Sequence, residues 1–234
     1  MKAYTYLAID LGALLIPFLF SFHHKLRFDK EWKYYLPAMV LVAIPFLIWD
    51  EYFTQIGIWG FNPDYLSGIY LGHLPLEEVM FFICIPYACV FTYHCFKIGG
   101  FNFLNDRISL WISLVLSLAL IAILSFYFGR FYTTSTFILL PLSILYLQFI
   151  KKAPYLKNLY FAYFFLQVPF FITNGLLTGS WIDQPIVWYD DSQNMGFRIA
   201  TIPFEDTFYG MLLILWNIAF FEGFKAKFSP VKEN

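Results

Sequence analysis

Two pairs of adjacent carboxylic acids are the residues of this chain best suited to chemistry. They lie in Pro75-Leu76-Glu77-Glu78 and in Pro203-Phe204-Glu205-Asp206, and each pair opens a long apolar run. Neighbouring carboxyls can act as general acid and general base, because one can hold a proton while the other is ionised. Proline followed by acids is also an ordinary helix start, stabilised by the helix dipole. The repetition beside apolar segments, where ionisable groups are costly, favours a functional site.

Asp50 ends an earlier apolar run and is the fifth candidate acid. Asp10 lies inside the first apolar run and is not counted among the candidates, and His73, four residues before Glu77, is expected in a polar loop. The chain has no HExxH pattern or Cys/His spacing that would predict a metal site. It also has no glycine-rich motif that would predict a nucleotide cofactor, so we expect no metal and no cofactor.

The composition describes the environment in which these acids must work. The chain has 234 residues, of which 60% are hydrophobic and 13% charged, and its mean hydropathy is +0.63. Soluble domains carry about 25% charged residues, so the composition predicts an integral membrane protein. The net charge of −1 does not predict nucleic acid as a partner.

Seven apolar runs are long enough to cross a bilayer as helices, since about 20 residues span the hydrocarbon. They lie at residues 3–22, 35–53, 76–96, 108–126, 133–150, 158–177 and 203–224. These runs are apolar on all sides, whereas the strands of a membrane β-barrel alternate. The predicted fold is therefore all-α and polytopic, with about seven transmembrane helices.

The basic residues predict an orientation for these helices. Segments 23–34, 97–107, 151–157 and 225–234 carry Lys and Arg, whereas the remaining connections hold Lys2, Arg130 and Arg198. Because Lys and Arg accumulate in cytoplasmic loops, we expect a multi-pass protein of the cell membrane with its N-terminus outside and its C-terminus in the cytoplasm. Both acid pairs then lie at the outer side.

A weak internal repeat connects the two acid pairs. Residues 44–48 (Ile-Pro-Phe-Leu-Ile) are similar to residues 168–172 (Val-Pro-Phe-Phe-Ile), and a long loop leads from each to its acids. Asn174 occupies the repeat position of Asp50. We therefore expect a first repeat at 1–100, a joining helix within 101–130 and a second repeat at 131–234. One joining helix gives both repeats the same orientation, and a binding site is expected between them.

The motifs resemble a known family. The series Trp59-Gly60-Phe61-Asn62-Pro63, Gly68, Leu74-Pro75-Leu76-Glu77-Glu78 and Phe81-Phe82 resembles the first half of the heterodimer-type lycopene β-cyclases. Pro203-Phe204-Glu205-Asp206 resembles the acidic motif of their second half. The resemblance is to the fused, single-chain form and covers nearly the whole length. The second loop departs from the first, with Val187-Trp188-Tyr189 where the first has the Trp-Gly-Phe-Asn-Pro motif.

The resemblance implies a lycopene β-cyclase, which converts lycopene to β-carotene through γ-carotene without any redox cofactor. A lipophilic C40 polyene would be the substrate, with the bilayer and other carotenoid-pathway enzymes as partners. Glu77 or Glu78 would protonate the polyene, and Glu205 or Asp206 would act as base or proton relay, with Asp50 as a further catalytic acid. Aromatic rings can stabilise a carbocation, and those expected at the substrate are Trp59, Phe81, Phe82 and Tyr209.

Three other functions fit parts of the pattern. A proton-coupled transporter with two repeats would use acids as a relay, but would carry them near mid-bilayer in both repeats. A related cyclase could form an ε-ring or act on a carotenoid of another length, and the sequence does not separate it from a β-cyclase. A seven-helix retinal protein needs a lysine in the middle of its last span, where this chain has none before Lys225.

Overall fold

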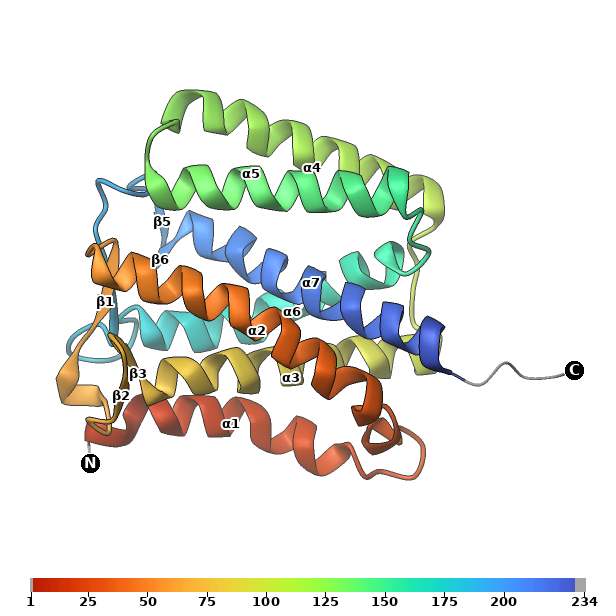
Figure 1. Cartoon of the computed structure of the whole chain (residues 1–234), viewed down its shortest axis with the longest axis horizontal. Coiled ribbons are helices and arrows are strands. Elements are labelled where there is room, and N and C mark those ends of the chain that lie inside the picture. The colour runs from red at the N-terminus through yellow and green to blue at the C-terminus, as the bar shows by residue number, and fades with distance from the viewer. Residues whose placement is uncertain (1, 230–234) are drawn as a thin grey trace, which may run out of the picture.

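The computed structural model describes residues 2–229, and these form seven long helices that run roughly side by side (Figure 1). All seven are long and apolar enough to cross a membrane, which confirms the predicted fold class. The predicted limits agree with the observed ones to within a few residues. Lys232, one of the basic residues used to predict the orientation, lies outside the described residues. The helices are α1 (Thr5–Phe20), α2 (Trp32–Gln55), α3 (Leu76–Gly99), α4 (Asp106–Tyr127), α5 (Phe131–Leu145), α6 (Leu156–Leu177) and α7 (Phe204–Phe228).

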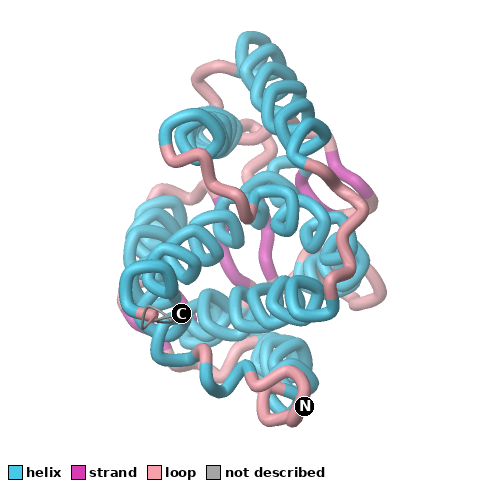
Figure 2. The backbone as a smooth tube through the Cα atoms, turned by 90° about the vertical axis from the view of Figure 1, so that its right-hand side faces the viewer, coloured by secondary structure: helices cyan, strands magenta, loops and turns pink. Residues whose placement is uncertain are grey.

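Three short antiparallel sheets lie at one end of the bundle, which we call the hairpin end (Figure 1). In Figure 2, which looks along the helices, the strands stand beyond them. Strands β2 (Tyr70–Leu71) and β3 (Leu74–Pro75) form one hairpin before α3, and β5 (Arg198–Ile199) and β6 (Ile202–Pro203) form another before α7. The third sheet pairs β1 (Trp59–Phe61) with β4 (Val187–Tyr189), so the two long loops are joined. Short 3-10 helices occupy Lys2–Tyr4, Phe28–Lys30 and Pro63–Tyr65, and a π-helical turn at Tyr146–Ile150 extends α5.

The two loops that lead to the acid pairs are built alike. Gly68 and Gly196 both adopt a positive φ, at 84° and 69°, a conformation that side chains with a Cβ rarely adopt. One residue after each glycine, a carbonyl accepts the first backbone N–H of the following helix, at 2.9 Å for Ile69 and Leu76 and at 3.1 Å for Phe197 and Phe204. The glycine that precedes each acid pair in the sequence therefore marks the same turn in both halves.

The helices pack as two interlocked three-helix units, α1–α3 and α5–α7. Within each unit the first helix packs against the third, as α1 does on α3 and α5 on α7. Each second helix crosses to the other unit, so that α2 packs on α7 and α6 on α3. Helix α4 lies outside, against α5 (Figure 1). Matching pairs of helices thus meet in the same way in both units, as two repeats with the same orientation require.

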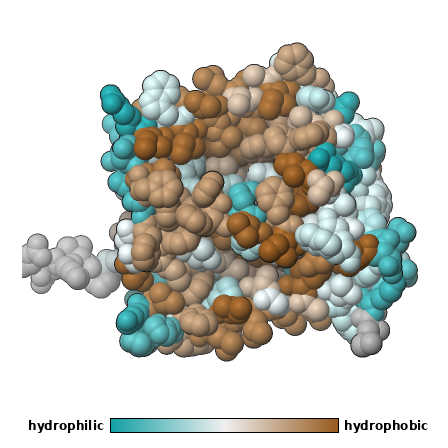
Figure 3. Space-filling view, turned by 180° about the vertical axis from the view of Figure 1, so that it is seen from behind, coloured by the Kyte–Doolittle hydropathy of each residue, from teal (hydrophilic) through white to brown (hydrophobic). Residues whose placement is uncertain are grey.

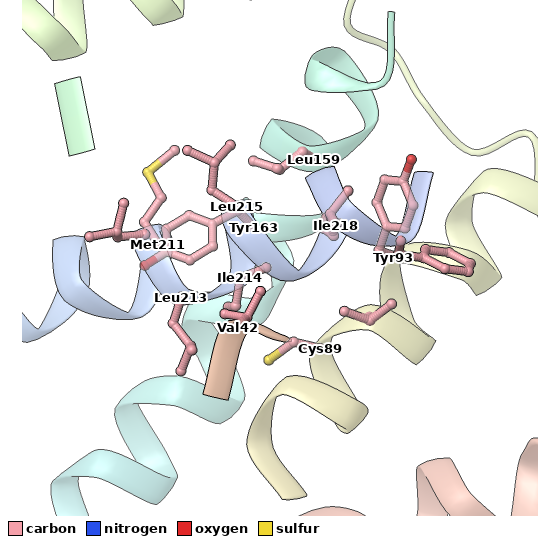
Figure 4. Packing of buried hydrophobic residues seen from close by; sticks show 14 of the residues in the cluster. Val42, Cys89, Tyr93, Leu159, Tyr163, Met211, Leu213, Ile214, Leu215 and Ile218 are labelled. Carbon is pink, nitrogen blue, oxygen red and sulfur yellow. The ribbon is translucent and has the colours of Figure 1, made fainter. Parts of the chain in front are cut away.

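The main hydrophobic core lies where α2, α3, α6 and α7 meet. Figure 4 shows this packing, with Val42 and Cys89 facing Leu213 and Ile214 of α7. The face shown in Figure 3 is also apolar along the middle of the bundle and hydrophilic mainly at its two ends. Leu118 in the middle of α4 is 65% exposed. An apolar belt with polar ends is the surface expected of a protein that lipid surrounds.

A buried hydroxyl ties α4 to the rest of the bundle. Ser113 Oγ lies 2.7 Å from the hydroxyl oxygen of Tyr160 on α6 and 3.0 Å from Oε1 of Gln148 after α5. It also bonds the carbonyl of Ser109 in its own helix. Polar contacts of this kind hold membrane helices together, because lipid supplies no hydrophobic driving force between them.

The substitution Ser113→Ala is expected to lower the free energy of unfolding by about 1 kcal/mol, the usual worth of such a bond in a membrane protein. Thermal unfolding in detergent measures the change. Ser125→Ala on the same helix is the control, since Ser125 is exposed and bonds only the carbonyl of Ala122. Equal midpoints for the two variants would contradict the role of Ser113.

Candidate active site

A cavity of about 270 Å³ lies between the two units, below the hairpin end. Helices α1, α3, α6 and α7 form most of its wall, and Asp50 of α2, Tyr132 of α5 and strands β1 and β4 complete it. The lining is mostly apolar and aromatic, with a few polar groups gathered at the hairpin end. A concave apolar site with a few convergent polar groups is the usual form of a binding site for a small molecule.

Glu78 forms the polar cluster that belongs to the first unit. Its Oε2 accepts a hydrogen bond of 2.5 Å from the hydroxyl of Tyr6 on α1. The carboxyl of Asp50 is its neighbour and accepts a hydrogen bond from Nε1 of Trp59 on β1. All four side chains line the cavity, and Glu78 is only 8% exposed. Two carboxyls thus share a dry site that offers few donors.

Asp206 forms the corresponding cluster of the second unit, and it is better supplied with donors. The hydroxyl of Tyr132 donates to Oδ1 at 2.7 Å, while Nδ2 of Asn174 and the hydroxyl of Tyr189 donate to Oδ2 at 2.7 and 3.0 Å. Burial and the nearby Asp206 carboxyl raise the pKa of Tyr189, a loop residue, so its hydroxyl stays a donor at neutral pH. Three neutral donors suit an ionised carboxylate.

The two clusters are built from matching positions. Tyr6 and Tyr132 both start the first helix of their unit and both donate to the second acid of the pair. Trp59 and Tyr189 are register partners in the β1–β4 sheet. The second loop therefore does contribute to the site, although its sequence differs from the first. Asn174 occupies the position in the second unit that matches Asp50 in the first. This replacement of an acid by an amide is the main chemical difference between the two clusters.

Glu77 and Glu205 also occupy matching positions, but neither lines the cavity. Both are fully buried. Oε1 of Glu77 accepts the backbone N–H of Ser67 at 2.6 Å, and Oε1 of Glu205 accepts that of Met195 at 2.7 Å. Thr133 on α5 also donates to Glu205, at 2.5 Å. Each glutamate thus holds the loop that precedes its own helix.

Of the aromatic residues expected at the substrate, some line the cavity and one does not. Trp59, Phe81 and Tyr209 line the cavity, and the rings of Trp59 and Tyr209 are 6.2 Å apart. Phe82 does not line it; its ring packs in the main core, 6.1 Å from that of Phe46. Adjacent residues on a helix face different directions, which accounts for the separation of Phe81 from Phe82.

Three lining tyrosines that donate hydrogen bonds to the acids were not predicted from the sequence, namely Tyr6, Tyr132 and Tyr189. Tyr6 and Tyr132 precede their acids by 72 and 74 residues, so only an alignment of α1 with α5 would have indicated them. Asp10, which was set aside, is fully buried on α1 outside the cavity. Among the described residues, no group of three or more His, Cys, Asp and Glu side chains could hold a metal ion.

Comparisons with known proteins identify the family of the chain. A family model described as "Lycopene cyclase" matches residues 3–96 and 129–224, nearly the whole of each three-helix unit. The bifunctional lycopene cyclase/phytoene synthase of Podospora anserina is 31% identical over 88 residues, which are 36% of this chain and 14% of that relative. The match therefore spans a small part of the relative's length. No solved structure matches the chain.

Replacing Glu77 or Glu205 by alanine is expected to lower the free energy of unfolding by about 1–3 kcal/mol, because a buried backbone N–H loses its acceptor. Thermal unfolding in detergent measures the loss. Glu77→Gln, which keeps an acceptor oxygen, should lose less, and Asp183→Ala should change little because Asp183 is exposed and pairs only with Lys2. Alanine variants as stable as the parent would show that these carboxyls do not hold the loops.

Proposed function

The chain belongs to the lycopene cyclase family, and from this premise we propose that it closes the ends of linear lycopene into β-rings by acid catalysis, through γ-carotene to β-carotene. The reaction is an isomerisation, since no atoms are gained or lost and no net electrons move. It requires an acid to start it, a base to end it and a dry cavity between the two.

The observation that carries the proposal is that Glu78 and Asp206, one from each unit, line the same cavity. Both are buried, and both lie at the hairpin end of a chamber whose remaining wall is mostly apolar. A greasy chain end can therefore lie in the chamber with a carboxyl from each unit beside it. A site made within one unit would not need the second pair of acids.

The donors around each carboxyl support a division of roles. Glu78 has one donor, Tyr6, and a second carboxyl, Asp50, as its neighbour, so holding a proton there avoids two adjacent negative charges. Asp206 has three donors and suits the ionised form. We assign Glu78 as the general acid, with Asp50 as its partner, and Asp206 as the general base.

The steps then balance in protons. The carboxyl of Glu78 adds its proton to the terminal double bond of the polyene, which leaves a tertiary carbocation. An internal double bond attacks this cation and forms the carbon–carbon bond that closes the six-membered ring. The Asp206 carboxylate takes a proton from the ring cation, which forms the ring double bond. Return of that proton to Glu78 completes the cycle.

The rings of Trp59, Phe81 and Tyr209 surround the place where the cation would form. An aromatic face attracts a desolvated cation by about 2 kcal/mol or more. These rings also exclude water, which would otherwise capture the cation. Phe82 supports Phe81 from the core at a ring distance of 5.6 Å, and Glu77 and Glu205 hold the loops that cover the cavity.

We further propose that the protein lies in the cell membrane with the hairpin end outside. The apolar belt supports a membrane location. Lys97 and Lys225, which pair with Glu222 and Glu31, mark the opposite end as the cytoplasmic one by the positive-inside rule. Other enzymes of the carotenoid pathway, which supply and consume its polyenes, would be partners in the same membrane.

Expression in cells that accumulate lycopene, followed by chromatography of the pigments, tests the function. The parent chain is expected to yield bicyclic β-carotene, and unchanged lycopene would refute the proposal. Glu78→Gln and Asp206→Asn should each reduce ring formation about 100-fold or more, because each removes one proton-transfer group. Glu51→Gln is the control, since Glu51 lies outside the cavity. Full ring formation by either variant would remove that acid from the mechanism.

We also propose that residues 1–100 and 131–234 are two fused repeats, with 101–130 as the joining segment. Residues 101–105 belong to no helix or strand, so the chain can be divided between Gly100 and Phe101. Residues 1–100 and 101–234, expressed together, are expected to restore ring formation, whereas neither piece should be active alone. Activity in a single piece would show that one unit holds a complete site.

A further inference from the structure

The cavity continues away from the acids as an apolar groove along α3. Phe81, Ile85, Ala88 and Thr92 are spaced at one helical face, and all four are only partly buried although α3 lies at the centre of the bundle. Helices α1 and α6 flank this face, with Ala13 of α1 and Thr173 of α6 in its walls. Helix α3 thus forms the bottom of the groove, and the groove leads toward the gap between α1 and α6.

That gap is closed at the hairpin end, and at the far end both α1 and α6 are attached to α3. Near the hairpin end, Tyr6 of α1 and Leu177 of α6 belong to one hydrophobic cluster. At the far end, Ser21 after α1 bonds the hydroxyl of Tyr87 at 2.6 Å, and Phe96 of α3 packs on Phe161 of α6 at 5.1 Å between ring centroids. Between these contacts, Ala13 and Pro17 of α1 and Thr173 of α6 line the groove and are only partly buried, while the larger Tyr163 and Leu166 of α6 line its inner part.

In the second unit, α5 matches α1 and α7 matches α3, while α2 matches α6. The equivalent gap therefore lies between α5 and α2, with α7 at its bottom. The offsets that match Glu78 with Asp206 and Asp50 with Asn174 also match Ala88 with Trp216 and Thr173 with Trp49. Trp216 donates to Ser143 of α5 at 2.9 Å, and its ring lies 5.5 Å from that of Phe46. Trp49 packs on Tyr209 at 5.0 Å. Large side chains therefore line the second gap, where a separate apolar pocket of about 310 Å³ lies between α2, α5 and α7 without an acid in its lining, whereas small side chains line the first gap and connect it to the acids.

The length of the groove limits how much of a linear carotenoid it can hold. From Glu78 to Thr92 it extends about 21 Å, at 1.5 Å per helical residue. A C40 polyene with a backbone of roughly 32 carbons is about 37 Å long, at about 1.2 Å per bond in an extended chain. The groove therefore accommodates little more than half of the polyene, and the rest must leave the protein through the open gap.

Resting on the proposed function, we infer that the gap between α1 and α6 is the port through which the linear carotenoid enters from the lipid, one half at a time. The reacting end lies at Glu78, and the other half remains in the bilayer, whose apolar interior suits it. The pocket at the equivalent gap between α5 and α2 has no acid in its lining, so a chain end that entered there would not reach Glu78. After the first ring forms, the chain leaves and its other end enters the same port.

The second unit supplies the substitution that tests the port. Ala88→Trp and Thr173→Trp each copy the residue found at the matching position of the second gap and are expected to slow ring formation on lycopene in liposomes by about tenfold or more, because the groove is filled. Ala119→Trp is the control, since Ala119 is exposed on the outer face of α4. Ring formation at the parent's rate by a folded Ala88→Trp or Thr173→Trp protein would overturn the port while leaving the proposed function intact.

A chase experiment tests entry by halves. Isotopically labelled lycopene is given to the parent protein for less than one turnover, and a large excess of unlabelled lycopene follows. The label is expected to remain mainly in the monocyclic product, because the released intermediate must compete to re-enter. Label that proceeds to the bicyclic product despite the chase would overturn entry by halves. A parent protein that forms no ring at all would instead refute the proposed function.

Discussion

Carboxyls buried away from water need hydrogen-bond donors from the protein itself, and this requirement governs how the molecule is built. Glu77 and Glu205 draw theirs from the backbone of the loops above them. Glu78 and Asp206 draw theirs from tyrosines at the start of α1 and α5. The same bonds that satisfy the acids thus fix the loops over the cavity and the first helix of each unit against the third. Loss of one acid would loosen several elements at once.

In the proposed mechanism, the two units carry out different tasks because their clusters are not identical. Asp50 gives Glu78 a second carboxyl as neighbour, whereas the matching Asn174 gives Asp206 a further donor. A change of one side chain from acid to amide thus separates a proton-holding site from a proton-accepting one. The same is true of the gaps, where Ala88 and Trp216 occupy matching positions. The shared framework sets the geometry, and a few substitutions set the chemistry.

Hydropathy alone was enough to predict seven helices, because a lipid-exposed backbone must satisfy its own hydrogen bonds over runs of about 20 residues. The proline-acid motifs likewise predicted that both acid pairs begin long helices, as they do in α3 and α7. The sequence could not show which acid of each pair faces the cavity, since adjacent helical residues differ by about 100° and packing selects the face. Glu78 and Phe81 lie in the cavity wall, while Glu77 and Phe82 do not.

The partners of the acids were harder to predict than the acids. Tyr189 lies in the loop before α7, whose sequence does not match that of the loop before α3. Only its pairing with Trp59 across the β1–β4 sheet places it beside Asp206. Tyr6 and Tyr132 begin apolar helices in which many aromatic residues are equally plausible. Contacts between segments that are distant in the chain depend on the assembled fold, which local patterns do not encode.

Helix α4 contributes no side chain to the cavity, yet it supplies the membrane crossing that gives both units the same direction. A unit of three helices ends on the side opposite to its start, so two units joined directly would point in opposite directions. Glu78 and Asp206 would then lie about 30 Å apart, at opposite faces of the bilayer. One additional crossing restores the common direction. Any apolar helix that keeps a polar contact such as that of Ser113 would serve this purpose, so the sequence of α4 is less constrained than that of the helices that line the cavity.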